Sequence, residues 1–269
     1  YPQHGALAKR AKACIRAKSG HTLVKRDYRS YHAKSLAWLS KDELYFKISD
    51  YDVHSLITSH FLRLPNANSL MDLPEMELRE ELLKIKTAYP DVRNLKAKRA
   101  VLGLGFHMGA DKLWRMNPDS FSSPLEAVAL IELIQSLFPK DFVDYPRRIQ
   151  KRITKSPCLV SPTGHRRWIW SGDLEQAVSF EPANIAHCHM FDSMLIMQER
   201  GLLDRWQLCN MIHDCLIFHC PNELLDECLQ ISGEIMERKS TVLLDSEFGP
   251  FQCTTDAEIG ESMAEMHGV

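Results

Sequence analysis

The stretch Met211-Ile-His213-Asp214-Cys215-Leu-Ile-Phe218 places two polar residues between two apolar runs. Short apolar runs that flank a polar pair are typical of two strands joined by a tight turn. The sequence therefore predicts a hairpin with His213 and Asp214 at its tip. The flanking residues are too apolar for a freely solvated hairpin, so we expect a buried turn with a functional role.

A second aspartate lies nearly the whole chain away. Asp27 ends an apolar run that begins at His21, and it precedes a helix predicted at about 30–39. One interpretation is that Asp27 caps this helix. The other is catalytic, because two carboxylates brought together can hold a pair of Mg²⁺ ions about 3.5–4 Å apart, as in nucleotidyl transfer. Asp27 and Asp214 are therefore candidate catalytic residues and metal ligands.

Between the two aspartates lies a segment with a helical pattern and several glycines, residues 98–109. A spacing of four residues places Lys98, Leu102 and Phe106 on one stripe of a helix. A lysine on this stripe could neutralise a triphosphate. The alternatives are that Lys98 extends from a half-buried helix and that Phe106 belongs to the core.

Taken in order, these three segments resemble the motifs of the family A DNA polymerases, the class of bacterial DNA polymerase I and related phage enzymes. The third motif, His-Asp-Glu, appears as His213-Asp214-Cys215, with a cysteine in place of the glutamate. The first motif is matched by Asp27-Tyr28, Leu36-Ala37, Leu39-Ser40, Asp42 and Asp52-Val-His54-Ser55.

The second motif is met by Lys98, Gly103 and Phe106, and its first arginine falls on Asn94, one place from Arg93. Weaker similarities extend the resemblance over essentially the whole chain: Tyr1-Pro-Gln3, Gly164-His-Arg166-Arg167 and Glu258-Ile-Gly260.

The resemblance implies roles for individual residues. Asp27 and Asp214 would bind two Mg²⁺ ions, with Mn²⁺ as an alternative, and Lys98 would contact the incoming triphosphate. The residues expected to bind the nucleotide substrate are Tyr28, His32, Arg93, Leu102 and Phe106. Those expected to bind DNA are Arg166, Arg167 and His213. Cys215 is not expected to bind the metal, because hard cations prefer oxygen ligands.

One residue bears on the choice of sugar. His32 matches the family glutamate that lies under the incoming sugar and blocks a 2′-hydroxyl. An imidazole is bulky enough to fill that space, and Phe106 lacks a phenolic oxygen that could bond a ribose hydroxyl. We therefore expect a preference for dNTPs. The alternative is that His32 is a surface histidine on the helix after Asp27.

The pattern predicts a helix at 95–114, a long helix from Pro182 to Arg200 and a late strand at 255–259. Few strands, many helices and strands from both ends of the chain indicate an α+β fold. The resemblance implies a right-hand polymerase fold, in which both chain ends form an antiparallel-sheet palm and helical fingers are inserted between them. We expect residues 1–50 and 173–269 in the palm and residues 51–172 in the fingers. We expect the thumb of the family to be absent from this stretch of sequence. Because the chain starts with Tyr1 rather than Met, we expect it to be part of a longer protein.

The composition is that of a soluble globular protein, with 45% hydrophobic and 25% charged residues. The net charge of −2 does not indicate a nucleic-acid binder, although binding requires only a local basic groove. Three basic clusters could supply such a groove, and the alternative for each is an ordinary solvated face. They are Lys9-Arg10-Ala-Lys12, Arg147-Arg148-Ile-Gln-Lys151-Arg152 and Arg166-Arg167.

Eight cysteines without a repeated spacing are typical of reduced thiols in an intracellular protein. No apolar run is long enough to predict a membrane span. We expect a cytoplasmic or other intracellular location, such as the nucleoid or a phage-infected host, with the mitochondrion left open.

The leading hypothesis is a DNA-directed DNA polymerase, a nucleotidyltransferase that adds dNTPs to a primer 3′-hydroxyl. Its partners would be primer-template DNA, dNTPs and an upstream thumb or exonuclease segment or separate chain, and no membrane. One alternative is a single-subunit RNA polymerase of the phage and mitochondrial type, whose Lys-Arg-Ser-Val-Met resembles Lys98-Arg99-Ala-Val101-Leu102. The other is a degenerate polymerase fold kept as a binding module, which Cys215, Asn94, His32 and His107 favour as departures from the family.

Overall fold

The computed structural model describes residues 6–170, 172–245 and 247–269, and the weak similarity at Tyr1-Pro-Gln3 lies outside them. The chain forms two compact units. The first contains the described residues up to Tyr31 together with Ala186–Leu244 and Pro250–Val269, and the second contains His32–Ile185 and Asp245–Gly249. These boundaries differ from those expected from the sequence, residues 50/51 and 172/173.

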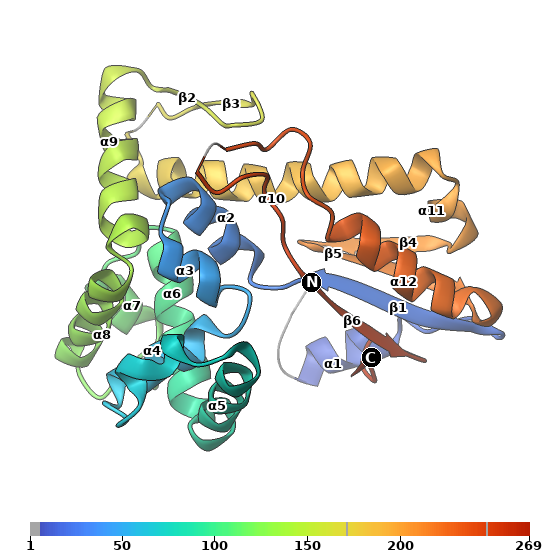
Figure 1. Cartoon of the computed structure of the whole chain (residues 1–269), viewed down its shortest axis with the longest axis horizontal. Helices are drawn as coiled ribbons and strands as arrows, with labels where there is room; N and C mark the ends of the chain where they lie inside the picture. Colours follow the sequence, from blue (N-terminus) through green and yellow to red (C-terminus); the bar gives the residue numbers. More distant parts are fainter. Residues whose placement is uncertain (1–5, 171, 246) are drawn as a thin grey trace. The chain divides into compact units, whose positions relative to one another are not determined.

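The first unit is built on an antiparallel sheet to which both ends of the chain contribute (Figure 1). Strand β1 (His21–Tyr28) pairs with β5 on one side and with β6 on the other. The strand order in the described part of the chain is β4-β5-β1-β6-β7. The other strands are β4 (Leu208–Ile212), β5 (Cys215–Pro221), β6 (Thr255–Gly260) and β7 (His267–Gly268). The predicted strand before Asp27, the hairpin at 213–214 and the late strand are all confirmed.

The two faces of β1 have different surroundings. Because side chains alternate along a strand, Arg26 and Tyr28 share one face, and Asp27 lies on the other. Helix α12 (Leu225–Met236) packs on the face of Arg26, whose guanidinium bonds the Leu229 carbonyl (Figure 1). Asp27 is therefore on the face that α12 leaves uncovered. The remaining elements of this unit are α1 (Ala6–Ala13), α11 (Leu202–Arg205) and a 3₁₀ turn (Asn222–Leu224).

The second unit is helical around a continuous apolar core. Its aromatic centre is formed by Tyr45, Phe138 and Phe142, with ring centroids of Tyr45 and Phe138 4.7 Å apart. Its helices are α2 (Tyr31–Ser40), α3 (Glu43–Ile48), α4 (Val53–Phe61), α5 (Glu75–Ala88), α6 (Lys98–Gly105), α7 (Ala110–Met116), α8 (Pro124–Leu137) and α9 (Tyr145–Lys155). Shorter elements are a 3₁₀ turn (Ala67–Asp72), π-helical turns (Val92–Ala97 and Lys140–Asp144) and the hairpin of β2 (Cys158–Val160) and β3 (Arg166–Trp168).

Two predicted helices have other bounds in the structure. The single helix expected at 95–114 is broken between α6 and α7, where His107 has a φ of 56° and the Met108 amide bonds the Gly103 carbonyl at 2.8 Å. The long helix expected from Pro182 begins earlier, since α10 spans Leu174–Glu199 with Pro182 inside it. Asp173 accounts for the earlier start, because its carboxylate accepts a bond from the Gln176 amide at 3.1 Å.

One boundary between the two compact units lies inside α10, between Ile185 and Ala186. In the described stretches of the chain, none of the helices has both the length and the apolar character that crossing a bilayer requires.

Candidate functional site

The turn between β4 and β5 holds the first candidate pair. Ile212 pairs with Cys215, so that His213 and Asp214 alone form the turn. His213 has a φ of 55°, in the left-handed region that few residues other than glycine adopt and that is common at functional sites. The Asp214 carbonyl accepts a hydrogen bond from the Tyr28 amide at 3.3 Å, which attaches the turn to the end of β1.

Asp27 lies directly opposite Cys215 across the β1–β5 pair and is thus next to the turn. The structure therefore brings the two candidate metal ligands, Asp27 and Asp214, to one end of the sheet. Burial, and then the charge of Asp27, raises the pKa of the Asp214 carboxyl to about 6.

A lysine that we did not predict lies at the same place. Lys25 Nζ is 2.9 Å from Asp27 Oδ2 and 3.0 Å from Glu258 Oε2. Burial opposes the charged form of this lysine, but its bonds to the two carboxylates outweigh burial and raise the pKa of Lys25. Alternation along β1 would have placed Lys25 on the face of Asp27. The β1–β6 register, which puts Glu258 opposite Lys25, was not predictable from the sequence.

The donor set suits a hard divalent cation. Among the described residues, no group of three or more His, Cys, Asp or Glu side chains surrounds a common metal position. The two carboxylates offer oxygen atoms, and Mg²⁺ is commonly held by one or two carboxylates plus water and substrate phosphates. Burial, followed by the charge of Asp27, raises the pKa of the Cys215 thiol to about 12, so this side chain stays a neutral thiol. The residues present therefore fit Mg²⁺.

Tyr28 does not present a free hydroxyl. Its side chain is 3% exposed, and its hydroxyl donates to the Met236 carbonyl at 3.0 Å and lies 3.1 Å from Ser193 Oγ. Its ring stacks on Tyr31 with centroids 4.1 Å apart. Tyr28 lies on the opposite face of β1 from Asp27, and contact of its side chain with a nucleotide stays a prediction.

In the second unit, Lys98, Leu102 and Phe106 form an exposed stripe on and just beyond α6. The two cations beside Lys98 already bind other side chains of this unit. Lys96 forms an ion pair with Glu126, and Arg99 donates to Asn117 Oδ1 and Ser120 Oγ, both at 2.8 Å. Lys98 has no hydrogen bond or ion pair with any described residue. It is therefore the cation in this set that remains available to a triphosphate.

His32 packs against this stripe. Its ring lies 5.2 Å from that of Phe106, at an interplanar angle of 28°. Shielding from solvent lowers the pKa of His32 to about 4, so the imidazole is neutral near pH 7. Its Nε2 is buried with no hydrogen-bond partner in the described part of the chain. A Cβ placed on Gly105 would lie 3.0 Å from His32 Cε1, which shows how closely the helix approaches the ring.

Arg93 is held by a carboxylate of its own unit. Its Nε and Nη2 donate to the two carboxylate oxygens of Asp52 at 2.8 and 3.0 Å. Asp52 also accepts bonds from the His54 and Ser55 amides at the start of α4. The guanidinium is thus already engaged, and its demonstrable role is to fix α4 against the turn at Val92–Ala97.

The two arginines of β3 differ in their surroundings. Arg167 Nη2 donates to Gln176 Oε1 at 3.0 Å, and its guanidinium lies over the Phe180 ring. Arg166, on the other side of the strand, is exposed and has no partner among the described residues. His213 is also exposed at the tip of its turn and Asp214 is half-buried, so the turn is not buried as expected.

A sheet formed by both ends of the chain, with a helical unit inserted between them in the sequence, is the arrangement expected of a right-hand polymerase fold. No model of a known protein family matches the sequence, and no curated protein matches it. Among solved structures, the polymerase domain of Pol1 from M. smegmatis, in complex with DNA primer-template and dNTP, has a similar fold. Its TM-score is 0.72 at 18% sequence identity, over 98% of this chain.

The chain spans less than half of that polymerase chain, 44% of its length. At this level of identity the likeness is one of fold. The expected fold class, an antiparallel-sheet palm from both chain ends with inserted helical fingers, is confirmed.

Proposed function

We propose that this chain is the palm and fingers of a template-directed DNA polymerase, a nucleotidyltransferase that joins dNTPs to a primer 3′-hydroxyl. The observation that carries the proposal is the convergence of Asp27 and Asp214 at one end of the sheet of a polymerase fold. Polymerase palms need two carboxylates there to hold divalent ions. A protein with only a binding role would have no need of this carboxylate pair.

In the first unit, Asp27 and Asp214 would hold two Mg²⁺ ions, or Mn²⁺ in their place. When bound, these ions would neutralise phosphate charge and favour deprotonation of the attacking hydroxyl. Lys25 fixes the Asp27 carboxylate through its ion pair. Tyr28 supports the strand from the other face, and His213 would contact the primer end from the exposed turn.

In the second unit, Lys98 would bind the triphosphate, where a cation stabilises charge that develops in the transition state. Leu102 and Phe106, on the same exposed stripe, would contact the base. His32 would limit the space at the 2′ position of the sugar, as a neutral ring held by Phe106. Arg93 would act by holding α4 in place through Asp52.

The M. smegmatis polymerase domain is in complex with DNA primer-template and dNTP, and we propose the same partners here. Arg166 and Arg167 would bind DNA phosphates, contacts that position DNA without reading its sequence. The proposed palm consists of residues 1–50 and 173–269, and the fingers of 51–172. A thumb or exonuclease segment, or a separate chain, would complete the polymerase inside the cell.

The test is a primer-extension assay with Mg²⁺, a labelled primer-template and either dNTPs or NTPs. We expect extension that requires the template and prefers dNTPs. Extension that is equal with NTPs would favour the single-subunit RNA polymerase alternative. DNA binding without extension under any metal and nucleotide condition would favour the degenerate binding module.

A further inference from the structure

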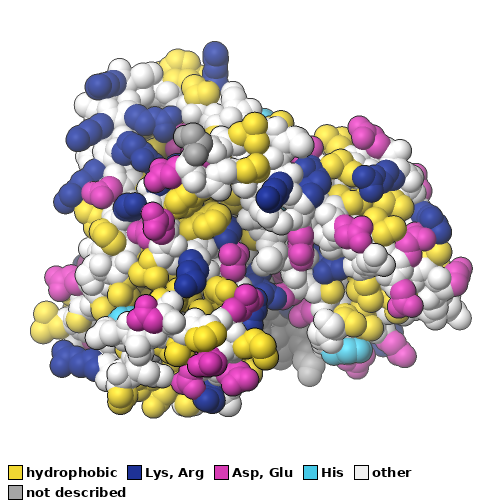
Figure 2. All heavy atoms as spheres, in the orientation of Figure 1, with side chains coloured by type: hydrophobic (Ala, Val, Ile, Leu, Met, Phe, Trp, Pro, Cys, Tyr) yellow, Lys and Arg dark blue, Asp and Glu magenta, His cyan; other side chains and the backbone are white. Residues whose placement is uncertain are grey.

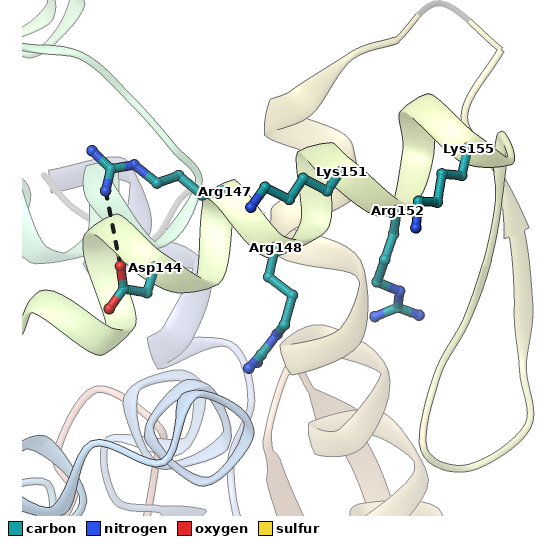
Figure 3. Close-up of a pocket in the computed structure, with 6 residues that line it drawn as sticks. All are labelled: Asp144, Arg147, Arg148, Lys151, Arg152 and Lys155. Carbon is teal, nitrogen blue, oxygen red and sulfur yellow. Dashed lines mark ion pairs between the residues drawn. The ribbon is translucent and has the colours of Figure 1, made fainter.

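Helix α9 carries an unusually dense set of positive charges for a chain with a net charge of −2. These cations line a hollow of about 530 Å³, and Asp144 lies at one end of it (Figure 3). The cations are Arg147, Arg148, Lys151, Arg152 and Lys155. No acidic residue interrupts them within the helix. Figure 2 shows a group of Lys and Arg side chains over this part of the second unit.

These cations form two stripes, because residues four apart lie on the same side of a helix. Arg148 and Arg152 extend from one side in Figure 3, and both are tied to the protein. Arg148 donates to the Leu39 carbonyl at 2.8 Å, and Arg152 donates to Glu181 Oε1 at 2.6 Å. The side chains of the second stripe form fewer hydrogen bonds and ion pairs with the described residues.

Arg147, Lys151 and Lys155 make up this second stripe, with successive residues about 6 Å apart along the axis. Among the described residues, the guanidinium of Arg147 has only a long contact with Asp144, at 3.9 Å. Lys151 and Lys155 are exposed and have no partner among the residues that the structure describes. Like charges four apart destabilise a helix, so an anionic ligand along the stripe would relieve this repulsion.

The β2–β3 hairpin adds an aromatic surface. Trp168 and Trp170 stack with centroids 4.9 Å apart and planes 7° from parallel. They are 53% and 79% exposed, although large apolar surfaces are usually buried unless they bind something. Alternation along β3 places Arg166 on the same side as Trp168. The exposed side of the hairpin thus combines two aromatic faces with an unpaired cation.

The hairpin and the helix are neighbours within the second unit. Trp168 pairs with Cys158, which follows the last residue of α9, Lys155, by three positions. In addition, Arg152 Nη2 donates to the Val160 carbonyl of β2 at 3.1 Å, which anchors the hairpin to the helix. The basic stripe and the tryptophan pair therefore lie on two joined elements of the second unit, which together form the candidate surface.

We propose that this surface binds single-stranded nucleic acid, with the α9 cations on the phosphates and the tryptophan pair stacked on bases. Binding of single strands requires both a basic track and aromatic platforms. A duplex would engage the cations, but its bases are already stacked and would leave the tryptophans without a role. The proposal does not rest on catalysis at Asp27 and Asp214, since it needs neither metal nor dNTP.

Fluorescence anisotropy with the whole chain provides the test, using labelled oligothymidylate of about 20 nucleotides, in EDTA and without dNTPs. We expect the double variant Trp168→Ala/Trp170→Ala to bind about 10-fold more weakly, and Trp168→Phe/Trp170→Phe to retain most of the affinity. Oligothymidylate should quench tryptophan fluorescence in the wild type and quench it less in either of these variants.

The double variant Lys151→Ala/Lys155→Ala tests the basic stripe. It should weaken binding and reduce the slope of log affinity against log salt by about 1.4, since each single-strand phosphate contact contributes about 0.7. Matched controls are Lys84→Ala/Lys86→Ala on α5 and Leu125→Ala on α8, all exposed residues. These should bind as the wild type does, and all variants should keep its melting temperature.

Wild-type affinity in either the tryptophan or the lysine double variant would overturn the proposal, because it needs both components. Binding to anionic phosphatidylserine vesicles in place of the oligonucleotide would overturn it as well. Primer extension by the wild type separates the two proposals. If the wild type extends primers but the variants bind the oligonucleotide as well as it does, the single-strand site alone is refuted. If the variants lose binding as predicted but the wild type does not extend primers, only the polymerase proposal is refuted.

Discussion

The ammonium of Lys25 lies 2.9 Å from the Asp27 carboxylate, on the face of β1 that α12 leaves uncovered. Glu258, opposite Lys25 on β6, holds the other side of the ammonium at 3.0 Å. Lys25 therefore has two acceptors that fix its position, and through it the position of Asp27. We infer that Lys25 is a positioning residue for the proposed metal-binding carboxylate.

The variant Lys25→Met should lower the single-turnover rate of primer extension about 10-fold, because a displaced catalytic group loses part of the benefit of orientation. DNA affinity should not change. Lys25→Arg should restore part of the rate, whereas Lys239→Met, an exposed lysine of the same unit, should have no effect. An unaltered rate in Lys25→Met would show that Asp27 needs no such support.

Lys98 and Lys96 should behave differently when each is changed to alanine. Lys98→Ala should reduce extension about 100-fold or more through the use of dNTPs, since a transition-state contact is lost. Lys96→Ala breaks the ion pair with Glu126 and should reduce stability with a smaller effect on rate. Rapid-quench kinetics over a range of dNTP concentrations, together with melting curves, distinguish the two. Equal kinetic losses would indicate a general basic surface.

His32→Gly should admit NTPs, because the ring that packs on Phe106 would no longer fill space near the sugar. Gly105→Ala should also alter sugar choice, since its new Cβ would lie 3.0 Å from the His32 ring and displace it. The control is His107→Gly, where an exposed histidine has a φ of 56° that glycine adopts readily. Misincorporation of NTPs is measured by alkali-sensitive primer extension. Unchanged discrimination in His32→Gly would contradict the assigned role.

Asp214 should make the metal-free chain less stable as the pH rises. The pKa of Asp214 is raised in the folded state to about 6 from its ordinary value of 3.8, so folding favours the protonated form. The stabilising contribution is present below about pH 4 and is lost as the pH rises through about 6. In EDTA, Asp214→Asn should raise the melting temperature by about 2–4 °C at pH 8 and much less at pH 4.5. A lower melting temperature at pH 8 would contradict this account of the site.

The sequence was most informative where a local pattern determines local structure. The run before Asp27 and the apolar residues around His213-Asp214 predicted two strands and a turn, and all three form. The helix break at His107 was missed, because a histidine in the left-handed region leaves no clear signature. The start of α10 was missed because Pro182 is a helix-start signal, and here the Asp173 cap lies upstream.

The candidate site was less predictable than the fold, since it depends on pairing between distant strands. Alternation along β1 alone predicts that Asp27 and Tyr28 lie on opposite faces of the strand. The contact between Lys25 and Glu258 needs the register of β1 with β6, which no local pattern encodes. Tertiary packing likewise decides which cations are paired. Arg93 binds Asp52, whereas Lys98 has no partner among the described residues.

The central claim is that Asp27 and Asp214 together bind divalent metal for nucleotidyl transfer. The most direct measurement is Mg²⁺-dependent single-turnover primer extension by the wild type, Asp27→Asn and Asp214→Asn, with DNA affinity measured in parallel. Asp256→Asn is the matched control, because Asp256 pairs with Asp27 in the β1–β6 register but forms an ion pair with Arg29. We expect each of the first two variants to lose at least about 1,000-fold in rate with nearly unchanged DNA affinity, and the control to retain most of the rate. Extension by either variant within about 10-fold of the wild type would contradict the claim.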